Sequence, residues 1–185
     1  MYEKELTSML KAAFDAEKKI LEVYHTSFTV EIKSDDSPVT AADKGADALI
    51  REELHKSFPA YAFLTEESKD DLSRLTNDYV FIVDPVDGTK EFVARNGEFC
   101  TNIALVYQHE AVVGVINVPL RQTVYYAIKG QGAWKKEKGK PAVLLHVSDR
   151  DTDLIAFKSL SFFNDKEKAL LDKHADRIAK IEGVG

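Results

Sequence analysis

The sequence predicts an α+β fold in which N-terminal helices pack on a mostly antiparallel sheet. Two observations support this prediction. Apolar residues recur at helical spacing through residues 1–24 and again through residues 40–57. Downstream, residues 100–108, 111–118 and 123–128 are apolar, β-branched segments joined by short polar turns, which is typical of an antiparallel meander. With 185 residues, 44% of them hydrophobic, the chain can bury one substantial core.

Helical periodicity is clearest near the N-terminus. Residues 1–24 place apolar side chains on one face, with Lys and Glu between them. A short β-prone segment, residues 28–32, follows. Thr40 is then expected to cap a second helix that runs to about Ser57, with the Asp43 carboxylate as its capping-box partner.

Strand signals dominate the middle of the chain. Residues 61–64 and 79–83 are interpreted as two short apolar strands ahead of the meander. The run 130–140, rich in Gly and Lys, is interpreted as a loop around Trp134.

The last segments predict a second, smaller part of the fold. Residues 153–157 indicate a strand, residues 164–180 a helix capped by its first residue, and residues 181–185 a strand entering a turn. A strand edge and a helix face would then lack partners. We therefore expect the N-terminal portion of a longer domain, with the main helices and sheet in about 1–150 and the start of a C-terminal subdomain in 151–185.

Charge and residue usage exclude several classes of protein. A formal net charge of −6 argues against a general nucleic-acid binder, which usually carries a basic face. The single cysteine, Cys100, excludes an intrachain disulfide, fits a reducing compartment and is interpreted as a small core residue. The N-terminus, with Glu3 and Glu5, has no signal-peptide pattern, and no segment approaches the roughly 18 apolar residues of a membrane span. A cytoplasmic protein without a nucleic-acid polymer as partner is expected.

The segment Asp84-Pro85-Val86-Asp87-Gly88-Thr89 carries the strongest chemical signal. It follows a buried strand and places two carboxylates three positions apart, ahead of Gly-Thr. Hard divalent cations such as Mg²⁺ prefer oxygen ligands of this kind. Backbone amides after the second Asp could hold an anion beside the metal. Taken alone, however, Asp-Pro is equally typical of a simple turn.

Two further acidic segments bear on the choice between a metal site and a simple turn. Glu66 and Glu67 follow the strand 61–64, so Glu66 could converge with Asp84 and Asp87 if the two strands are neighbours. Three carboxylates so close together repel one another strongly without a cation. Taken singly, Glu66 and Glu67 could be a solvated pair, and Asp43 only a capping carboxylate. Their joint occurrence favours a functional site.

The combined motifs resemble those of the inositol monophosphatase superfamily. The segment 84–89 is similar to its metal-binding signature, and Glu66-Glu67-Ser68 to its acidic segment. Within the superfamily, three further segments look like the 3′(2′),5′-bisphosphate nucleotidases of the CysQ type: residues 37–43 (SPVTAAD), 88–92 (GTKEF) and 95–99 (RNGEF). The resemblance extends from about residue 5 to 148.

The resemblance implies a set of Mg²⁺ ligands for two or three ions. These are the carboxylates of Glu66, Asp84 and Asp87 and the backbone carbonyl of Val86. Mg²⁺ takes few protein carboxylates and completes its shell with water and substrate phosphate, which agrees with such a small ligand set.

The resemblance also implies the catalytic and substrate-binding residues. Thr89 would orient or deprotonate the attacking water, together with Glu66 or Asp43. The amides of Gly88 and Thr89 would hold the scissile phosphate, with Glu66 and Asp87 also at the substrate. A threonine hydroxyl is too weak a base to act without a carboxylate.

The family's fold and reaction follow as expectations. The fold would be a layered α/β/α/β sugar-phosphatase architecture. The reaction would remove the 3′-phosphate of adenosine 3′,5′-bisphosphate to give AMP and phosphate, with inhibition by Li⁺. The resemblance further implies a cytoplasmic enzyme, or one peripheral at the inner membrane, that is a monomer or a homodimer. A phosphatase of the same superfamily acting on inositol phosphates or fructose 1,6-bisphosphate is the alternative.

One part of the family pattern is missing. Relatives carry a C-terminal Trp-Asp pair whose Asp is a further metal ligand, whereas the only tryptophan here, Trp134, precedes Lys135. This departure keeps open a third hypothesis of another class: an inactive, truncated metal-binding or partner-binding fragment.

Overall fold

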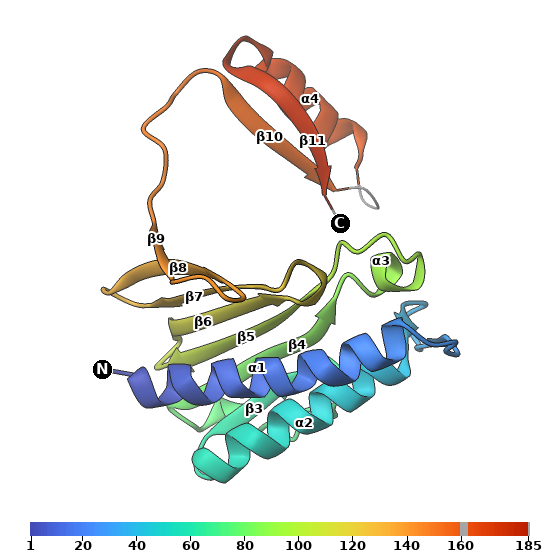
Figure 1. Ribbon diagram of the computed structural model, residues 1–185, viewed down its shortest axis with the longest axis vertical. Helices are drawn as coiled ribbons and strands as arrows, with labels where there is room; N and C mark the ends of the chain where they lie inside the picture. The colour runs from blue at the N-terminus through green and yellow to red at the C-terminus, as the bar shows by residue number, and fades with distance from the viewer. Residues whose placement is uncertain (160–162, 185) are drawn as a thin grey trace. The chain divides into compact units, whose positions relative to one another are not determined.

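The computed structural model describes residues 1–159 and 163–184. The chain forms two compact units, Met1–Leu145 and His146–Gly185 (Figure 1). Within the described residues, no helix combines the length and the apolar character that crossing a lipid bilayer requires.

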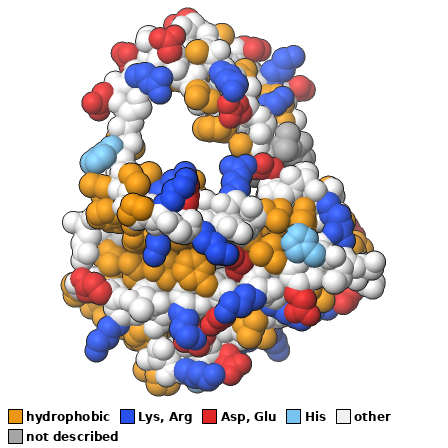
Figure 2. Space-filling model, viewed as in Figure 1, with side chains coloured by type: hydrophobic (Ala, Val, Ile, Leu, Met, Phe, Trp, Pro, Cys, Tyr) orange, Lys and Arg blue, Asp and Glu red, His pale blue; other side chains and the backbone are white. Residues whose placement is uncertain are grey.

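Two long helices lie together on one face of the sheet in the first unit (Figure 1). They are α1 (Glu3–Tyr24) and α2 (Ala41–Ser57), as the periodicity predicts. Small side chains allow the helices to approach closely, and Ala13 and Ala46 are fully buried. On the solvent side, basic and acidic side chains are interspersed (Figure 2), and pairs such as Lys11–Asp15 are one helical turn apart.

The sheet of the first unit has seven strands in the order β3-β4-β5-β6-β7-β8-β9. Their bounds are β3 (Ala62–Thr65), β4 (Tyr79–Asp87), β5 (Cys100–Tyr107), β6 (Glu110–Val118), β7 (Thr123–Ile128), β8 (Gly132–Glu137) and β9 (Val143–Leu145). Only β3 and β4 are parallel, and all other neighbours are antiparallel. The predicted meander is therefore confirmed.

Short elements complete the first unit. The hairpin of β1 (Glu31–Ile32) and β2 (Pro38–Val39) precedes α2, and the one-turn helix α3 (Thr89–Val93) follows β4. Short 3₁₀ turns occupy Ser73–Leu75 and Pro119–Arg121.

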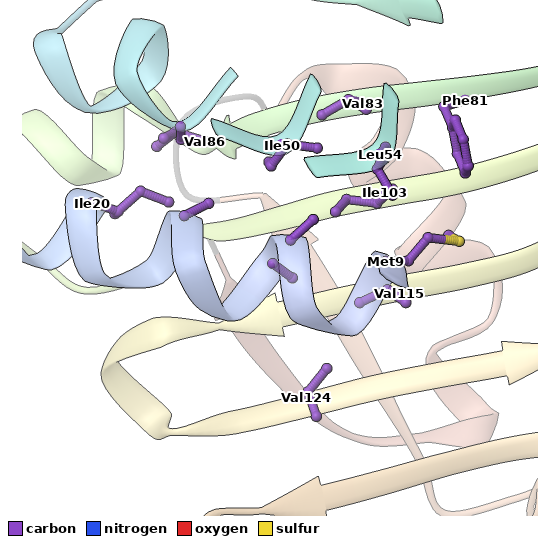
Figure 3. Close-up of a cluster of buried hydrophobic side chains, with 14 of the residues drawn as sticks. Met9, Ile20, Ile50, Leu54, Phe81, Val83, Val86, Ile103, Val115 and Val124 are labelled. Atoms are coloured by element: carbon purple, nitrogen blue, oxygen red, sulfur yellow. The ribbon is translucent and has the colours of Figure 1, made fainter. Parts of the chain in front are cut away.

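The hydrophobic core lies between the helices and the sheet (Figure 3). Along β4, Phe81 and Val83 are buried while the intervening Ile82 is 40% exposed, which is the alternation expected of a sheet with one covered face. Ile20 of α1 and Ile50 of α2 close the core from the helical side. Fully burying such a side chain contributes about 1.5–3 kcal/mol, so this layer fixes the position of β4 and of the residues that follow it.

The interpretation of residues 130–140 as a loop is wrong. Trp134 lies within β8, paired with Tyr126 of β7 and Leu144 of β9. Gly130 and Gly139, both with positive φ, form the turns on either side. Cross-strand pairing of the residues between them outweighs the Gly and Lys content that suggested a loop.

The second unit contains two parallel strands, β10 (Leu154–Ser159) and β11 (Ile178–Val184), joined through α4 (Asp165–Lys173). The predicted strand at 153–157 is confirmed, and Asn164 caps α4 as expected. The predicted helix is too long, because α4 ends at Lys173 and a 3₁₀ turn, Ala175–Arg177, leads into β11. Pairing with β10 overrides the helical pattern there. Of the strand predicted at 181–185, Gly185 lies outside the described residues.

Candidate active site

The parallel pair β3 and β4 brings two acidic segments together. Thr65 is in register with Val83, and the Glu66 N–H donates a hydrogen bond of 3.1 Å to the Val83 carbonyl. The strands are thus neighbours, as convergence of the carboxylates requires. Glu66 and Asp84 each follow the last residue pair of the β3–β4 ladder, Thr65 and Val83, and therefore lie at the same end of the two parallel strands.

Asp84 is the least exposed of the three carboxylates Glu66, Asp84 and Asp87. Its Oδ1 is buried and has no hydrogen-bond partner. Burial, together with the neighbouring carboxylates of Glu66 and Asp87, raises the pKa of Asp84 to about 8. A carboxyl group in this environment is costly to ionise without a cation.

The donor set fits Mg²⁺ in its chemistry, because it consists of carboxylate oxygens of which one is buried and unpartnered. Among the described residues, no three His, Cys, Asp or Glu side chains are already arranged around a single ion position. The carboxylates of Glu66 and Asp87 instead accept hydrogen bonds from protein donors. Lys33 Nζ lies 2.8 Å from Glu66 Oε1, and Asn102 Nδ2 donates to Asp87 Oδ2 at 2.8 Å.

Lys33 is a site residue that the sequence reasoning missed. Its ammonium group bridges Glu66 and Glu67, with Nζ–Oε1 distances of 2.8 and 2.5 Å. Burial lowers the pKa of Lys33, but the hydrogen bonds to the two glutamates outweigh this effect and the net pKa is raised. Glu66 lies 33 positions and Glu67 lies 34 positions after Lys33 in the sequence, so no local spacing could have revealed these contacts.

Thr89 and Asp43 meet across the site. Thr89 Oγ1 lies 3.1 Å from Asp43 Oδ1 and 3.1 Å from the Val86 carbonyl oxygen. The single hydroxyl proton of Thr89 can form a good hydrogen bond with only one of these two acceptors. Asp43 is 1% exposed, and its Oδ2 accepts hydrogen bonds from the Thr40 N–H at 2.8 Å and the Thr40 hydroxyl at 2.6 Å. The carboxylate that completes the capping box of α2 is therefore also the one that faces Thr89.

Gly88 forms the sharp turn between β4 and α3. Its φ of 90° is in the left-handed region, and a Cβ at this position would lie 2.8 Å from the Glu98 carbonyl oxygen. Only glycine fits both conditions without strain. The turn places Thr89 at the first position of α3, immediately after the carboxylates of β4.

Cys100 is not the core residue that the sequence suggested. It is partly exposed and in register with Asp87, and its Sγ lies 3.9 Å from Asp87 Oδ2. Burial raises the pKa of the Cys100 thiol to about 12, with a further contribution from the charges of Asp87 and Asp84. The thiol therefore stays protonated beside the carboxylates. Only the register of β5 against β4, which the sequence does not specify, reveals this placement.

Sequence comparisons identify relatives of the chain. A sequence profile of the inositol monophosphatase family matches residues 2–177. The 3′(2′),5′-bisphosphate nucleotidase CysQ of Salmonella typhimurium is 42% identical over 138 residues, which are 72% of this chain and 55% of the relative. The CysQ of Escherichia coli is 38% identical over 137 residues, with the same two coverages, 72% and 55%. The chain thus spans about half the length of these curated relatives.

Comparison with solved structures confirms the fold. The crystal structure of CysQ from Bacteroides thetaiotaomicron, described as a bacterial member of the inositol monophosphatase family, superposes with a TM-score of 0.81 at 31% identity and covers 99% of this chain and 72% of that one. The suhB protein of Bartonella henselae gives a TM-score of 0.82 at 27% identity, covering 98% and 70%. The predicted layered α+β architecture is therefore correct.

Proposed function

Because the chain belongs to the inositol monophosphatase family, we propose that it supplies the metal- and phosphate-binding part of a Mg²⁺-dependent phosphomonoesterase. The reaction proposed is removal of the 3′-phosphate from adenosine 3′,5′-bisphosphate, which releases AMP and phosphate. The observation that supports it most strongly is the cluster of Glu66, Asp84 and Asp87, in which a buried oxygen of Asp84 has no hydrogen-bond partner.

The proposed metal ligands are Glu66, Asp84, Asp87 and the carbonyl oxygen of Val86. Bound Mg²⁺ would supply a Lewis acid that lowers the pKa of water and neutralises charge on the phosphate. The protein holds its own ligands in place through β4, whose core residues are buried on the helical side, and through the Asn102–Asp87 hydrogen bond of 2.8 Å.

Thr89 and Asp43 are proposed to handle the proton of the attacking water. When the Thr89 hydroxyl donates to Asp43 Oδ1, its lone pairs can accept a hydrogen bond from water. Asp43 can then accept the proton that Thr89 alone is too weakly basic to take. Thr40 holds the other oxygen of Asp43 with two hydrogen bonds, so the carboxylate cannot turn away.

The scissile phosphate is proposed to bind at the turn after β4. The backbone N–H groups of Gly88 and Thr89 begin α3 and are suited to an anion. Asp87 directly precedes this turn, and Glu66 lies next to Asp84. Both carboxylates would contact the substrate only through bound cations, because carboxylates repel phosphate.

The choice of substrate rests on the curated relatives. The relatives at 42% and 38% identity are named 3′(2′),5′-bisphosphate nucleotidases, and the segment 88–92 carries the Lys-Glu pair that favours this subgroup. An inositol-phosphate or fructose-1,6-bisphosphate phosphatase remains the alternative on the same scaffold. A phosphorylated small molecule is the proposed partner in each case.

The test is a phosphate-release assay with Mg²⁺ on this chain and on the longest natural form of the protein. Adenosine 3′,5′-bisphosphate, inositol 1-phosphate and fructose 1,6-bisphosphate are compared at equal concentration. We expect the nucleotide to be hydrolysed fastest and Asp87→Asn to abolish Mg²⁺-dependent turnover while the variant stays folded. Faster turnover of inositol 1-phosphate would overturn the substrate proposal, and full activity of Asp87→Asn the ligand role.

Calorimetry distinguishes the third hypothesis, a metal- or partner-binding fragment without activity, from the two enzyme hypotheses. Mg²⁺ binding by this chain without turnover of any of the three substrates would favour it. Turnover by this chain at a rate comparable to that of a full-length relative would exclude it.

A further inference from the structure

Helix α2 carries a second buried carboxylate one turn after Asp43. Asp47 is 4% exposed, and residues four apart lie on the same face of a helix. Asp43 contacts Thr89, whereas Asp47 contacts a different segment, the short loop after β3.

Ser68 is the residue that Asp47 holds. The Ser68 hydroxyl donates to Asp47 Oδ2 at 2.5 Å, and Arg51 donates from its guanidinium to Ser68 Oγ at 2.8 Å. The Ser68 N–H donates to Thr65 Oγ1 at 3.2 Å. Arg51 in turn lies over the Phe63 ring of β3, with its Cζ 6.0 Å from the ring centroid. These contacts tie the end of the loop to α2.

The loop from 65 to 68 is thereby fixed at both ends. At its start, the Glu66 N–H bonds to the Val83 carbonyl at 3.1 Å, and at its end Ser68 bonds to Asp47. Glu66 lies between the two anchors. Its carboxylate position therefore depends on how Ser68 is held.

The environment of Asp47 indicates that this residue orients its neighbours rather than stabilises the fold. Its Oδ1 is buried without a hydrogen-bond partner, which leaves much of the cost of burying a carboxylate uncompensated. An apolar residue would suit the core better. Groups that do not bind the metal themselves but fix the position of a metal ligand through hydrogen bonds are a recurring feature of metal sites.

We propose that Asp47, acting through Ser68, is a positioning residue for Glu66 and sets the affinity of the site for Mg²⁺. This inference rests on the proposed function, because it takes Glu66 as a metal ligand. Asp47 touches neither substrate nor metal in this proposal.

The test is the Mg²⁺ affinity of this chain, measured by calorimetry with MgCl₂ as the only ligand. We expect Asp47→Asn and Ser68→Ala each to weaken Mg²⁺ binding about tenfold or more, the range for loss of a residue behind a metal ligand. Ser68→Thr keeps the hydroxyl and should retain wild-type affinity. Asp15→Asn, which removes an exposed carboxylate of α1, is the matched charge control and should change nothing.

A double-mutant cycle separates positioning from a general structural effect. In a Glu66→Gln background, Asp47→Asn should have no further effect on Mg²⁺ affinity, because the group it positions is already changed. An additive loss, or wild-type affinity in both Asp47→Asn and Ser68→Ala, would overturn the proposal. Should Asp47→Asn not fold, the Ser68→Ala and Ser68→Thr pair decides by itself. Unchanged affinity in Glu66→Gln would instead refute the ligand role of Glu66 and thus the proposed function.

Discussion

The hydroxyl of Thr89 lies 3.1 Å from Asp43 Oδ1, across 46 positions of sequence. The carboxylate that it meets is also the capping-box residue of α2. One side chain therefore starts a helix and faces the candidate catalytic threonine, so the fold and the site depend on the same buried group.

Asp43→Asn should separate these two roles. Asn is isosteric and keeps an oxygen, but it is too weakly basic to accept a proton, so we expect kcat to fall by about 10²–10⁴. Loss of the charge-assisted bonds from Thr40 should cost about 1–2 kcal/mol of unfolding free energy. Steady-state kinetics and urea unfolding measure the two effects.

Thr40→Ser is the control for this variant, since it keeps both hydrogen bonds to Asp43 and should leave kcat within about twofold of the wild type. Near-normal kcat in Asp43→Asn would restrict Asp43 to its capping role.

Asp84 predicts a pH dependence of stability in the metal-free chain. Its pKa in the folded state is raised from the ordinary value of 3.8 to about 8, mainly by burial and then by the charges of Glu66 and Asp87. Between these two values the folded state binds more protons than the unfolded state, so stability falls as pH rises from about 4 to about 8 and then levels off. Mg²⁺ binding should strengthen over the same range, because it requires the ionised carboxylate.

Urea unfolding in EDTA at a series of pH values measures this effect. Asp84→Asn cannot ionise, and its stability should change less between pH 5 and pH 8 than that of the wild type, by the same linkage. Equal pH dependence in the two proteins would contradict the assignment to Asp84.

The sequence predicts those parts of the fold and site whose signals are local. The period of α1, the cap at Thr40 and the meander were all visible in short windows, and so was the acidic motif after β4. The strand containing Trp134 and the early end of α4 at Lys173 were not, because pairing with distant strands decides both.

The same distinction applies to the site. Asp43, Glu66, Asp84 and Thr89 belong to recognisable motifs, and the structure brings Glu66 to Asp84 and Asp43 to Thr89. Lys33 and Cys100 belong to none of these motifs. Their partners are fixed by a hairpin and by strand register, which no spacing along the chain encodes.

Lys33 predicts a competition with the metal. Its single ammonium group pairs with both Glu66 and Glu67, and the side chain of Glu67 is 6% exposed. Lys33→Met should lower the unfolding free energy in EDTA by about 1–3 kcal/mol, because Glu67 loses a charged partner. Added Mg²⁺ should then raise the Tm of the variant by more than it raises that of the wild type, since Glu66 no longer has a competing cation.

Lys44→Met is the matched control, because Lys44 pairs at 2.7 Å with Glu31, away from Glu66, and both partners are more than half exposed. Its stability should change by less than about 1 kcal/mol. Equal Tm shifts with Mg²⁺ in Lys33→Met and the wild type would refute the competition.

Gly88 should tolerate no side chain. In Gly88→Ala the left-handed φ of 90° costs about 1–2 kcal/mol, and the Cβ would also lie 2.8 Å from the Glu98 carbonyl oxygen, so the turn must shift. Gly139→Ala isolates the first effect, since its φ is 75° and nothing lies within 4 Å of its Cβ position. We expect Gly88→Ala to be the less stable of the two in urea unfolding and to lose Mg²⁺-dependent turnover, because the turn carries Thr89. Equal stability losses with retained turnover would show that the contact with Glu98 does not constrain the site.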